Sequence, residues 1–263
     1  MPDSIHSGHR ERIREHYKTH GADAFLDHQF LELLLTYAIP RKDTNELAHQ
    51  LLARFGTLEG VVTAEIAQLM LVEGIGESAA VFLRMQGDLF RRLRLHRLAD
   101  ARGSIRLTSP VEAARYAVSQ LSLNTYETVL AVCLNAKKVV QSCERVVGGS
   151  LSEAQIYPRN IAELALLHRA HGILLVHNHP SGDPSPSKAD AETTESVRAA
   201  LESIGVQLYD HIIVGGDHAY SFSTGAVIGV SGAEAEVFSL SDYQALQAQA
   251  ARTGALLKVM EPY

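Results

Sequence analysis

Residues 173–190 read ILLVHNHPSGDPSPSKAD and indicate the class of fold more clearly than any other segment. It begins with the apolar run ILLV, which is short enough to predict a buried strand. His177 and His179 stand at the end of that run, and the prolines that follow prevent the strand from continuing. Ser187 and Asp190 then have the spacing of a helix N-terminus, which predicts a helix over about 187–204. A buried strand joined by a short loop to a helix predicts a layered structure of strands and helices.

The chain on either side of that stretch also mixes strands with helices. The sequence Ser109-Pro110-Val111-Glu112 predicts a helix start, with a Ser cap, a Pro in the first turn and a Glu that completes a capping box. Two β-rich runs, 127–134 and 138–147, are separated by a short polar segment and predict a hairpin. Further elements are expected as a helix over 158–170 and strands over 206–214 and 218–222. Together they predict an α/β or α+β domain with a mixed β-sheet flanked by helices.

The residues before about 103 read as a small all-α domain. A helix over 30–37 is expected to stop before Pro40, since the residue that precedes a proline is pushed out of the helical region. A second helix over 44–55 is expected to end at Gly56. We therefore predict a helical domain at 1–103, a domain of mixed strands and helices at 104–230 and a tail at 231–263 with one helix over about 241–252.

Composition limits the classes of function. The chain has 263 residues, of which 46% are hydrophobic, and a net charge of −6, so it does not bind nucleic acid over its whole surface. No apolar run approaches the roughly 18 residues of a membrane span, and the N-terminus lacks the pattern of a secretory signal, so a cytoplasmic protein without membrane contact is expected. Cys133 and Cys143 form no Cys-x-x-Cys motif, so a metal would have to be bound by histidines and carboxylates.

The two histidines and the aspartate suggest a metal site. Alternate residues of a strand point to the same face, so His177 and His179 can offer two imidazoles to one ion. Asp190, in the first turn of the following helix, could reach back as a third ligand. Two imidazoles, one carboxylate and an open fourth position are typical of catalytic zinc, which lowers the pKa of its bound water to about 7.

Structural explanations of the same residues remain open. Ser187 and Asp190 also form a helix capping box, and a histidine pair at a strand end is often solvated or buried in a core. The joint occurrence of all four residues at the mouth of a buried strand favours the metal.

These residues carry a family resemblance. His177, His179, Ser187 and Asp190 match the pattern His-x-His, seven residues, Ser, two residues, Asp, which resembles the JAMM/MPN+ (JAB) metalloprotease signature. The fuller string HNHPSGDPSPS is similar to the bacterial RadC branch, also known as UPF0758, as are the segments 37–43, 74–76, 158–159 and 210–215. The resemblance implies a cytidine deaminase-like fold and a zinc-dependent hydrolase or protease that cleaves an amide or isopeptide bond in a protein or peptide.

The resemblance also assigns roles to residues. It places a general acid/base glutamate on the first strand of the domain, where Glu127 matches and Glu144, on the second strand, competes. It gives Ser187 the task of stabilising an oxyanion, although the same hydroxyl is needed to cap its helix. Asp210 and His211 match a family dipeptide and are expected to support the metal ligands or to form a buried structural pair. Asn160 departs from the pattern, because RadC relatives usually have Glu there.

A weaker signal lies in the helical domain. Gly74 and Gly76 resemble a helix-hairpin-helix turn, in which glycines let backbone amides approach a DNA phosphate. Glu77 occupies a place where DNA-binding hairpins often carry a basic residue, but a run of arginines from Arg84 to Arg102 follows. The same glycines could serve helix packing or a protein contact. The alternative to the hydrolase is therefore a DNA-binding, repair-associated accessory protein with a structural or vestigial metal site.

Overall fold

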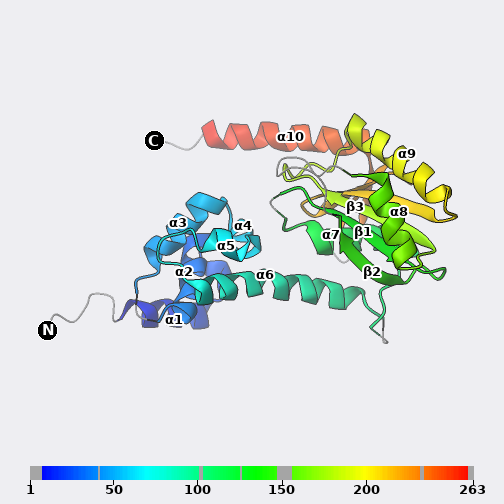
Figure 1. Cartoon of the computed structure of the whole chain (residues 1–263). Helices are drawn as coiled ribbons and strands as arrows, with labels where there is room; N and C mark the ends of the chain where they lie inside the picture. Colours follow the sequence, from blue (N-terminus) through cyan, green and yellow to red (C-terminus); the bar gives the residue numbers. More distant parts are fainter. Residues whose placement is uncertain are drawn as a thin grey trace. The chain divides into compact units, whose positions relative to one another are not determined.

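The computed structural model describes residues 8–40, 42–100, 103–124, 126–146, 156–231 and 234–259 (Figure 1), with side chains up to residue 251 in the last helix. The contacts of the chain divide it into two units, Met1–Leu93 and Arg94–Tyr263, and the division falls inside helix α6. Each unit has its own buried core. None of the described helices is long and apolar enough to span a membrane.

The first unit is helical, as the sequence predicts. Its elements are α1 (His9–His20), η1 (Ala22–Ala24), α2 (Asp27–Ala38), α3 (Asn45–Phe55), α4 (Leu58–Thr63), α5 (Ile66–Leu69) and the first part of α6 (Glu77–Leu98). The expected ends of α2 before Pro40 and of α3 at Gly56 are both confirmed, and Gly56 has a φ of 82°, which only glycine adopts without strain. Fully buried Leu31, Leu51 and Leu83 tie α2, α3 and α6 into one core.

The second unit is built on a seven-stranded mixed sheet with the order β2-β1-β3-β4-β5-β6-β7. The strands are β1 (Val129–Leu134), β2 (Val140–Arg145), β3 (Gly172–Asn178), β4 (Gln207–Gly215), β5 (His218–Ser221), β6 (Ala226–Gly229) and β7 (Glu236–Ser239). Only β3 and β4 run parallel, because helix α9 connects them, while every other neighbouring pair is antiparallel. The predicted mixed sheet flanked by helices is confirmed.

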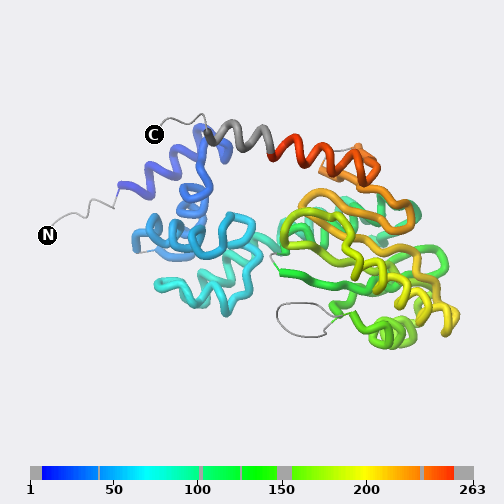
Figure 2. The backbone as a smooth tube through the Cα atoms, turned by 90° about the horizontal axis from the view of Figure 1, so that it is seen from above, coloured from blue at the N-terminus to red at the C-terminus, as the bar shows by residue number. Residues whose placement is uncertain are grey.

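Helices cover both faces of this sheet. Helix α7 (Pro110–Leu121) packs on one face, against Leu174 and Val176 of β3. Helices α8 (Pro158–Leu167) and α9 (Lys188–Glu202) lie next to each other on the opposite face, against Ile173 and Leu175 (Figure 2). Side chains alternate along a strand, so His177 shares the α8/α9 face with Leu175. The fold therefore directs the end of β3 toward the N-terminus of α9.

Three details differ from the sequence expectation. Glu127 was expected to open the first strand, but β1 begins at Val129, because the Thr128 backbone N–H is bonded to the Asn178 side chain. Strands β6 and β7 were not predicted. Each has four residues, too few for an alternation of apolar and polar residues to be recognised in the sequence. Helix α10 (Leu240–Val259) covers the predicted tail helix, and Val147, the expected end of the second hairpin strand, lies outside the described residues.

Candidate metal centre

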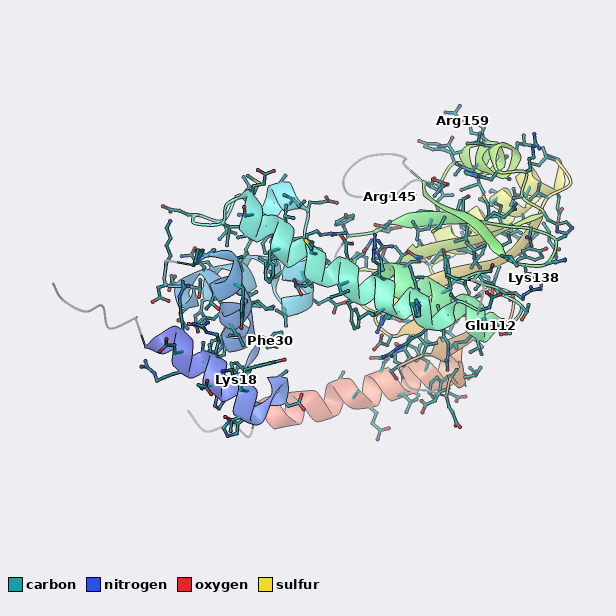
Figure 3. All side chains as sticks on the ribbon, turned by 90° about the horizontal axis from the view of Figure 1, so that it is seen from below. Lys18, Phe30, Glu112, Lys138, Arg145 and Arg159 are labelled. Carbon is teal, nitrogen blue, oxygen red and sulfur yellow. The ribbon has the colours of Figure 1, made fainter. Side chains whose placement is uncertain are left out.

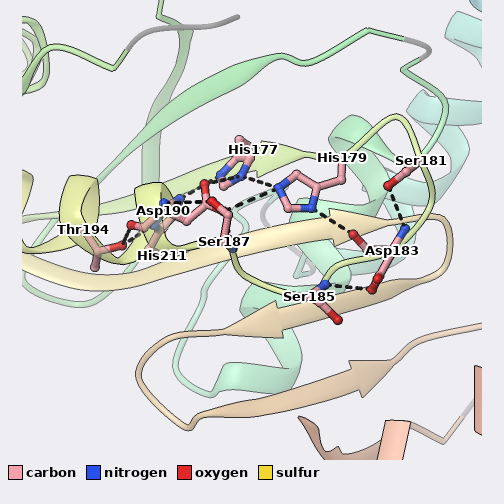
Figure 4. Close-up of polar contacts among 9 residues, drawn as sticks. All are labelled: His177, His179, Ser181, Asp183, Ser185, Ser187, Asp190, Thr194 and His211. Atoms are coloured by element: carbon pink, nitrogen blue, oxygen red, sulfur yellow. Dashed lines mark hydrogen bonds and ion pairs between the residues drawn. The ribbon is translucent and has the colours of Figure 1, made fainter. Parts of the chain in front are cut away.

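Three candidate ligands come together at the end of β3. His177 is the second-to-last residue of β3, and His179 directly follows the strand. Asp190 lies in the first turn of α9. His177 Nε2 is 3.1 Å from His179 Nε2 and 3.2 Å from Asp190 Oδ1, while His179 Nε2 is 3.7 Å from Asp190 Oδ2 (Figure 4). Among the described residues, this is the one group of three metal-ligating side chains whose donor atoms lie within 4.8 Å of one another.

The loop after β3 fixes the ring of His179. Its Nδ1 is 2.8 Å from the Asp183 carbonyl oxygen, which can only accept a hydrogen bond, so Nδ1 carries the proton and Nε2 offers a lone pair to the site. The loop in turn packs on Gly215 of β4, where a Cβ would lie 2.5 Å from the Gly182 carbonyl oxygen. The close backbone contact with Gly215 therefore holds the loop that carries this imidazole.

Asp190 serves two purposes at once. Its Oδ2 accepts hydrogen bonds from Ser187 N–H at 2.7 Å and Ser187 Oγ–H at 2.6 Å, which completes the capping box. Its Oδ1 faces His177. Partial burial acts to raise the pKa of Asp190, but the contacts with His177, His179 and Ser187 outweigh burial and hold this pKa far below its usual value. The capping and ligand interpretations are therefore compatible, because each uses a different carboxylate oxygen.

The negative charge at the site also acts on His179. Its contact with Asp190 raises the pKa of His179 against the effect of burial, and the Asp183 carbonyl and the charge of Glu127 act in the same direction. The surroundings of this imidazole thus favour a positive charge. A cation, whether a proton or a metal ion, is what these donors would stabilise.

The two candidate glutamates lie in different surroundings. Glu127 is half-buried just before β1, and β1 pairs with β3 so that Val129 is opposite His177, which places Glu127 beside the end of β3. Its charge acts on His179. Glu144 lies on β2, two strands away from β3, and its carboxylate contacts His168 Nε2 at 3.3 Å. The arrangement favours Glu127 over Glu144 for proton transfer at the site.

The predicted dipeptide Asp210-His211 is divided between the two faces of the sheet. The His211 ring lies behind the metal centre, where its Nε2 is 2.8 Å from His177 Nδ1. The Asp210 carboxylate instead accepts hydrogen bonds from Ser221 and Ser223 at 2.6–2.9 Å and from the backbone N–H of His211, not from its ring. Burial raises the pKa of Asp210 against these hydrogen bonds. Both residues are buried, but only His211 contacts a candidate metal ligand, since alternate residues of β4 point in opposite directions.

Thr194 is not among the predicted site residues, but its hydroxyl is 2.6 Å from His211 Nδ1. The only signal in the sequence is its position four residues after Asp190, which places both on one face of α9. Asn178 was also missed. Its side chain accepts from Thr128 N–H at 2.9 Å and donates to the carbonyl oxygens of Asn124 and Tyr126 at 3.0 and 3.2 Å, so it anchors the segment that carries Glu127.

Gly74 and Gly76 lie in the turn before α6, as expected. Gly74 has a φ of 93°, a backbone conformation that other residues rarely adopt, so the turn itself requires a glycine there. Gly76 has open space around it. The arginines that follow are partly neutralised, since Arg84 and Arg91 both contact the Asp88 carboxylate, at 3.6 and 3.7 Å. Arg102 lies outside the described residues.

Comparisons with known proteins agree with this architecture. A family model of the RadC-like JAB domain matches residues 107–227, and a model of the UPF0758 N-terminal family matches residues 6–81. A UPF0758 protein of Fusobacterium nucleatum is 33% identical over 227 residues, which are 84% of this chain and 97% of the relative. A UPF0758 protein of Ruegeria pomeroyi is 37% identical with the same coverage, and one of Herminiimonas arsenicoxydans is 32% identical over 81% of this chain and 94% of its own length. Strand β7 and helix α10 lie beyond both family matches.

Proposed function

Since this chain belongs to the UPF0758 family and carries a RadC-like JAB domain, we propose that it is a zinc-dependent hydrolase that cleaves amide or isopeptide bonds in a protein or peptide substrate. The observation that supports this proposal most strongly is the convergence of His177, His179 and Asp190 at the end of β3. The relatives are named only as UPF0758 proteins, so the proposed activity rests on the site and the domain type rather than on their names.

The donor set fits zinc. Two imidazole nitrogens and one carboxylate oxygen are the ligands of catalytic zinc sites, which leave a fourth position for water or substrate. His177 is buried, whereas His179 and Asp190 are partly exposed, so the site opens to solvent on the side of the loop. A zinc ion bound there would polarise the scissile carbonyl and make water reactive near neutral pH.

Glu127 is suited to move the proton. Its carboxylate lies beside the end of β3, where it can accept a proton from the attacking water and deliver it to the leaving amine nitrogen. The Asn178 side chain makes three hydrogen bonds to the backbone on either side of Glu127. These bonds hold in place the segment that carries Glu127.

Ser187 is suited to stabilise the oxyanion, with one condition. Its hydroxyl donates to Asp190 Oδ2 at 2.6 Å, so it must turn toward the substrate oxygen to take that role. The backbone N–H of Ser187 still donates to Asp190 Oδ2 when the hydroxyl turns. A single such donor contributes about 10²–10³ in rate in other hydrolases.

Metal analysis tests the proposal directly. We expect about one zinc per chain in the purified protein, and loss of that zinc in His179→Ala and Asp190→Ala. His171→Ala, which removes an exposed histidine just before β3, is the matched control and should retain the metal. A freshly prepared protein that contains no metal and takes up none when zinc is added would exclude the hydrolase.

A second experiment separates catalysis from metal binding. We expect Glu127→Gln to retain zinc but to lose at least about 10²-fold in hydrolysis of fluorogenic peptide amides and lysine-linked isopeptides. Glu144→Gln, the same change at the competing glutamate, should retain both zinc and activity. Equal loss of activity in the two variants would contradict the role of Glu127.

The DNA-binding alternative has less support from the helical unit. Gly74 is needed for the backbone conformation of its turn, and Asp88 contacts two of the arginines that were expected to carry the charge. A salt titration of binding to plain duplex DNA decides this question, since phosphate contacts weaken steeply as salt increases. Salt-dependent binding by the full chain together with absence of metal would favour the accessory protein over the hydrolase.

A further inference from the structure

Two buried side chains stand behind His177 on the side away from the metal centre. His211 Nε2 lies 2.8 Å from His177 Nδ1, and Thr194 Oγ1 lies 2.6 Å from His211 Nδ1 (Figure 4). Thr194 Oγ1 is also 2.6 Å from the backbone carbonyl oxygen of Asp190. The side chains thus form an unbroken chain of hydrogen bonds from the backbone of α9 to the imidazole at the end of β3.

The chemistry of the groups fixes the direction of every bond in that chain. A carbonyl oxygen only accepts, so the single hydroxyl proton of Thr194 points to the Asp190 carbonyl. Thr194 Oγ1 must then accept from His211, which places a proton on His211 Nδ1. In a neutral ring the other nitrogen is an acceptor, so His211 Nε2 accepts from His177 Nδ1–H.

We propose that Thr194 and His211 are positioning residues that fix the tautomer of His177, so that its Nδ1 carries the proton and its Nε2 lone pair faces the metal centre. The role of this arrangement in binding a metal rests on the function proposed above. The assignment of the ring protons rests only on the hydrogen bonds. Histidines that bind metals generally donate their second ring N–H to a fixed partner, and that partner raises the basicity of the ligand and orients its ring.

The reverse direction is disfavoured by the short contacts. If Thr194 donated to His211 Nδ1, the oxygens of Thr194 and the Asp190 carbonyl would face each other at 2.6 Å without a proton between them. His211 would then donate to His177, and the remaining N–H of His177 would point into the metal centre. Only the proposed direction places a proton in every contact of the chain.

The surroundings keep the chain in this state. His177, Thr194 and His211 are each only 1% exposed, so water does not replace a missing partner. The Phe222 ring stacks on His211 with 5.0 Å between ring centroids and an angle of 9°, which fixes the plane of that imidazole. The two nitrogens of this buried ring face a hydroxyl and another imidazole, and burial disfavours a charged imidazole. His211 is therefore a neutral acceptor toward His177.

Nitrogen NMR of the metal-free protein tests the assignment without reference to zinc. At about pH 8, above the ordinary imidazole pKa of about 6.5, a long-range ¹H–¹⁵N spectrum should show protonated Nδ1 and unprotonated Nε2 in both His177 and His211. A protonated Nε2 with an unprotonated Nδ1 on His177 would overturn the proposal. This result stands even if the protein binds no metal, so it is independent of the proposed hydrolase.

Zinc affinity tests the consequence. Thr194→Val keeps the shape of the side chain but removes the acceptor for His211, and we expect it to weaken zinc binding by about 10–100-fold in competition with a chromogenic chelator. Thr194→Ser restores the hydroxyl and should bind zinc within about threefold of the wild type.

The matched control is Thr63→Val in the helical unit. Thr63 is also a buried helical threonine whose hydroxyl donates to the carbonyl four residues earlier, Glu59, at 2.8 Å, but it belongs to the other unit of the chain. It controls for the loss of such a hydroxyl and should leave zinc affinity unchanged. Thr194→Val with wild-type zinc affinity would overturn the proposal, even if the variant is less stable. If Thr194→Val does not fold, the NMR spectrum of the wild type still decides.

Discussion

At the scale of single residues, Asn178 shows where sequence analysis stops. The spacing of His177, His179 and Asp190 is local, so the sequence alone predicts that they can meet. Asn178 stands between the two histidines, but its partners lie about fifty residues earlier in the chain. No periodicity connects Asn178 with Thr128, because only the pairing of β1 with β3 brings them together. Thr194 was missed for the same reason, since its partner is on β4.

We predict that Asn178→Leu destabilises the protein and displaces Glu127. The substitution leaves the Thr128 N–H and two carbonyl oxygens without their partner, and each buried group so deprived costs about 1–3 kcal/mol. The free energy of unfolding, measured with urea, should fall by about 2–4 kcal/mol. Asn160→Leu, at a half-buried position of α8, is the control and should change it by less than about 1 kcal/mol. A loss no larger than that of the control would contradict the anchoring role.

At the scale of elements, capping boxes were read correctly because their signal is contained in four residues. The helix start at Ser109 is confirmed. Ser109 Oγ accepts from the Glu112 N–H at 3.2 Å, and the Glu112 carboxylate accepts from the Ser109 N–H at 3.0 Å. Figure 3 labels Glu112 at this end of α7. The start of β1 was placed too early because a side chain, not the neighbouring strand, receives the Thr128 N–H.

The capping box at the start of α7 is expected to make the stability of the protein depend on pH in the acid range. Bonds from the Thr108 hydroxyl and the nearby backbone amides lower the pKa of Glu112 below its ordinary value of 4.5, against the opposing effect of burial. Because the folded pKa is lower than the unfolded one, Glu112 adds stability that is complete above pH 4.5 and is lost as the pH falls through the folded value. The Tm difference between wild type and Glu112→Gln should therefore be constant near neutral pH and shrink below 4.5.

The control for this measurement is Glu163→Gln, at an exposed position of α8, which removes the same negative charge outside a capping box. A difference between wild type and Glu112→Gln that does not change with pH would show that the charge of Glu112 contributes nothing to the cap.

The loop between β3 and α9 depends on the close contact at Gly215. A methyl group there would lie 2.5 Å from the Gly182 carbonyl oxygen and 2.6 Å from the Pro184 nitrogen, and both neighbours are backbone atoms. We predict that Gly215→Ala displaces the loop, weakens zinc binding by about tenfold and lowers the free energy of unfolding by about 1–3 kcal/mol. Gly76→Ala, which meets open space, should leave the zinc affinity as it is. Unchanged zinc affinity in Gly215→Ala would mean that the loop tolerates the shift.

At the scale of the whole molecule, the C-terminal segment completes the domain. The residues after 230 were predicted only to form a tail with one helix over about 241–252. The structure shows that β7 adds an edge strand to the sheet and that α10 packs on β6 and β7. Tyr243 of α10 is buried in a cluster with Ile213, Tyr220 and Val227. This cluster lies close to the metal centre, since Ile213 is paired with His177 across β3 and β4.

The same segment lies near the loop that carries His179. Burial raises the pKa of Tyr243, its bond from Gln247 opposes that effect, and the charge of Asp183 raises the pKa further. Asp183 is the residue whose carbonyl oxygen holds the His179 ring. The segment therefore supports the sheet, although it lies beyond both family matches.

We predict that Tyr243→Ala lowers the free energy of unfolding of the sheet-containing unit by about 3 kcal/mol, because it leaves a cavity among buried side chains. Leu246→Ala, one turn further along α10 at a position that is 49% exposed, should cost less than about 0.5 kcal/mol. Urea unfolding followed by circular dichroism measures both values. If the two variants are equally stable, α10 does not form part of the folded domain. If Tyr243→Ala alone is destabilised, the C-terminal segment is as much a part of the core as the family domain on which it packs.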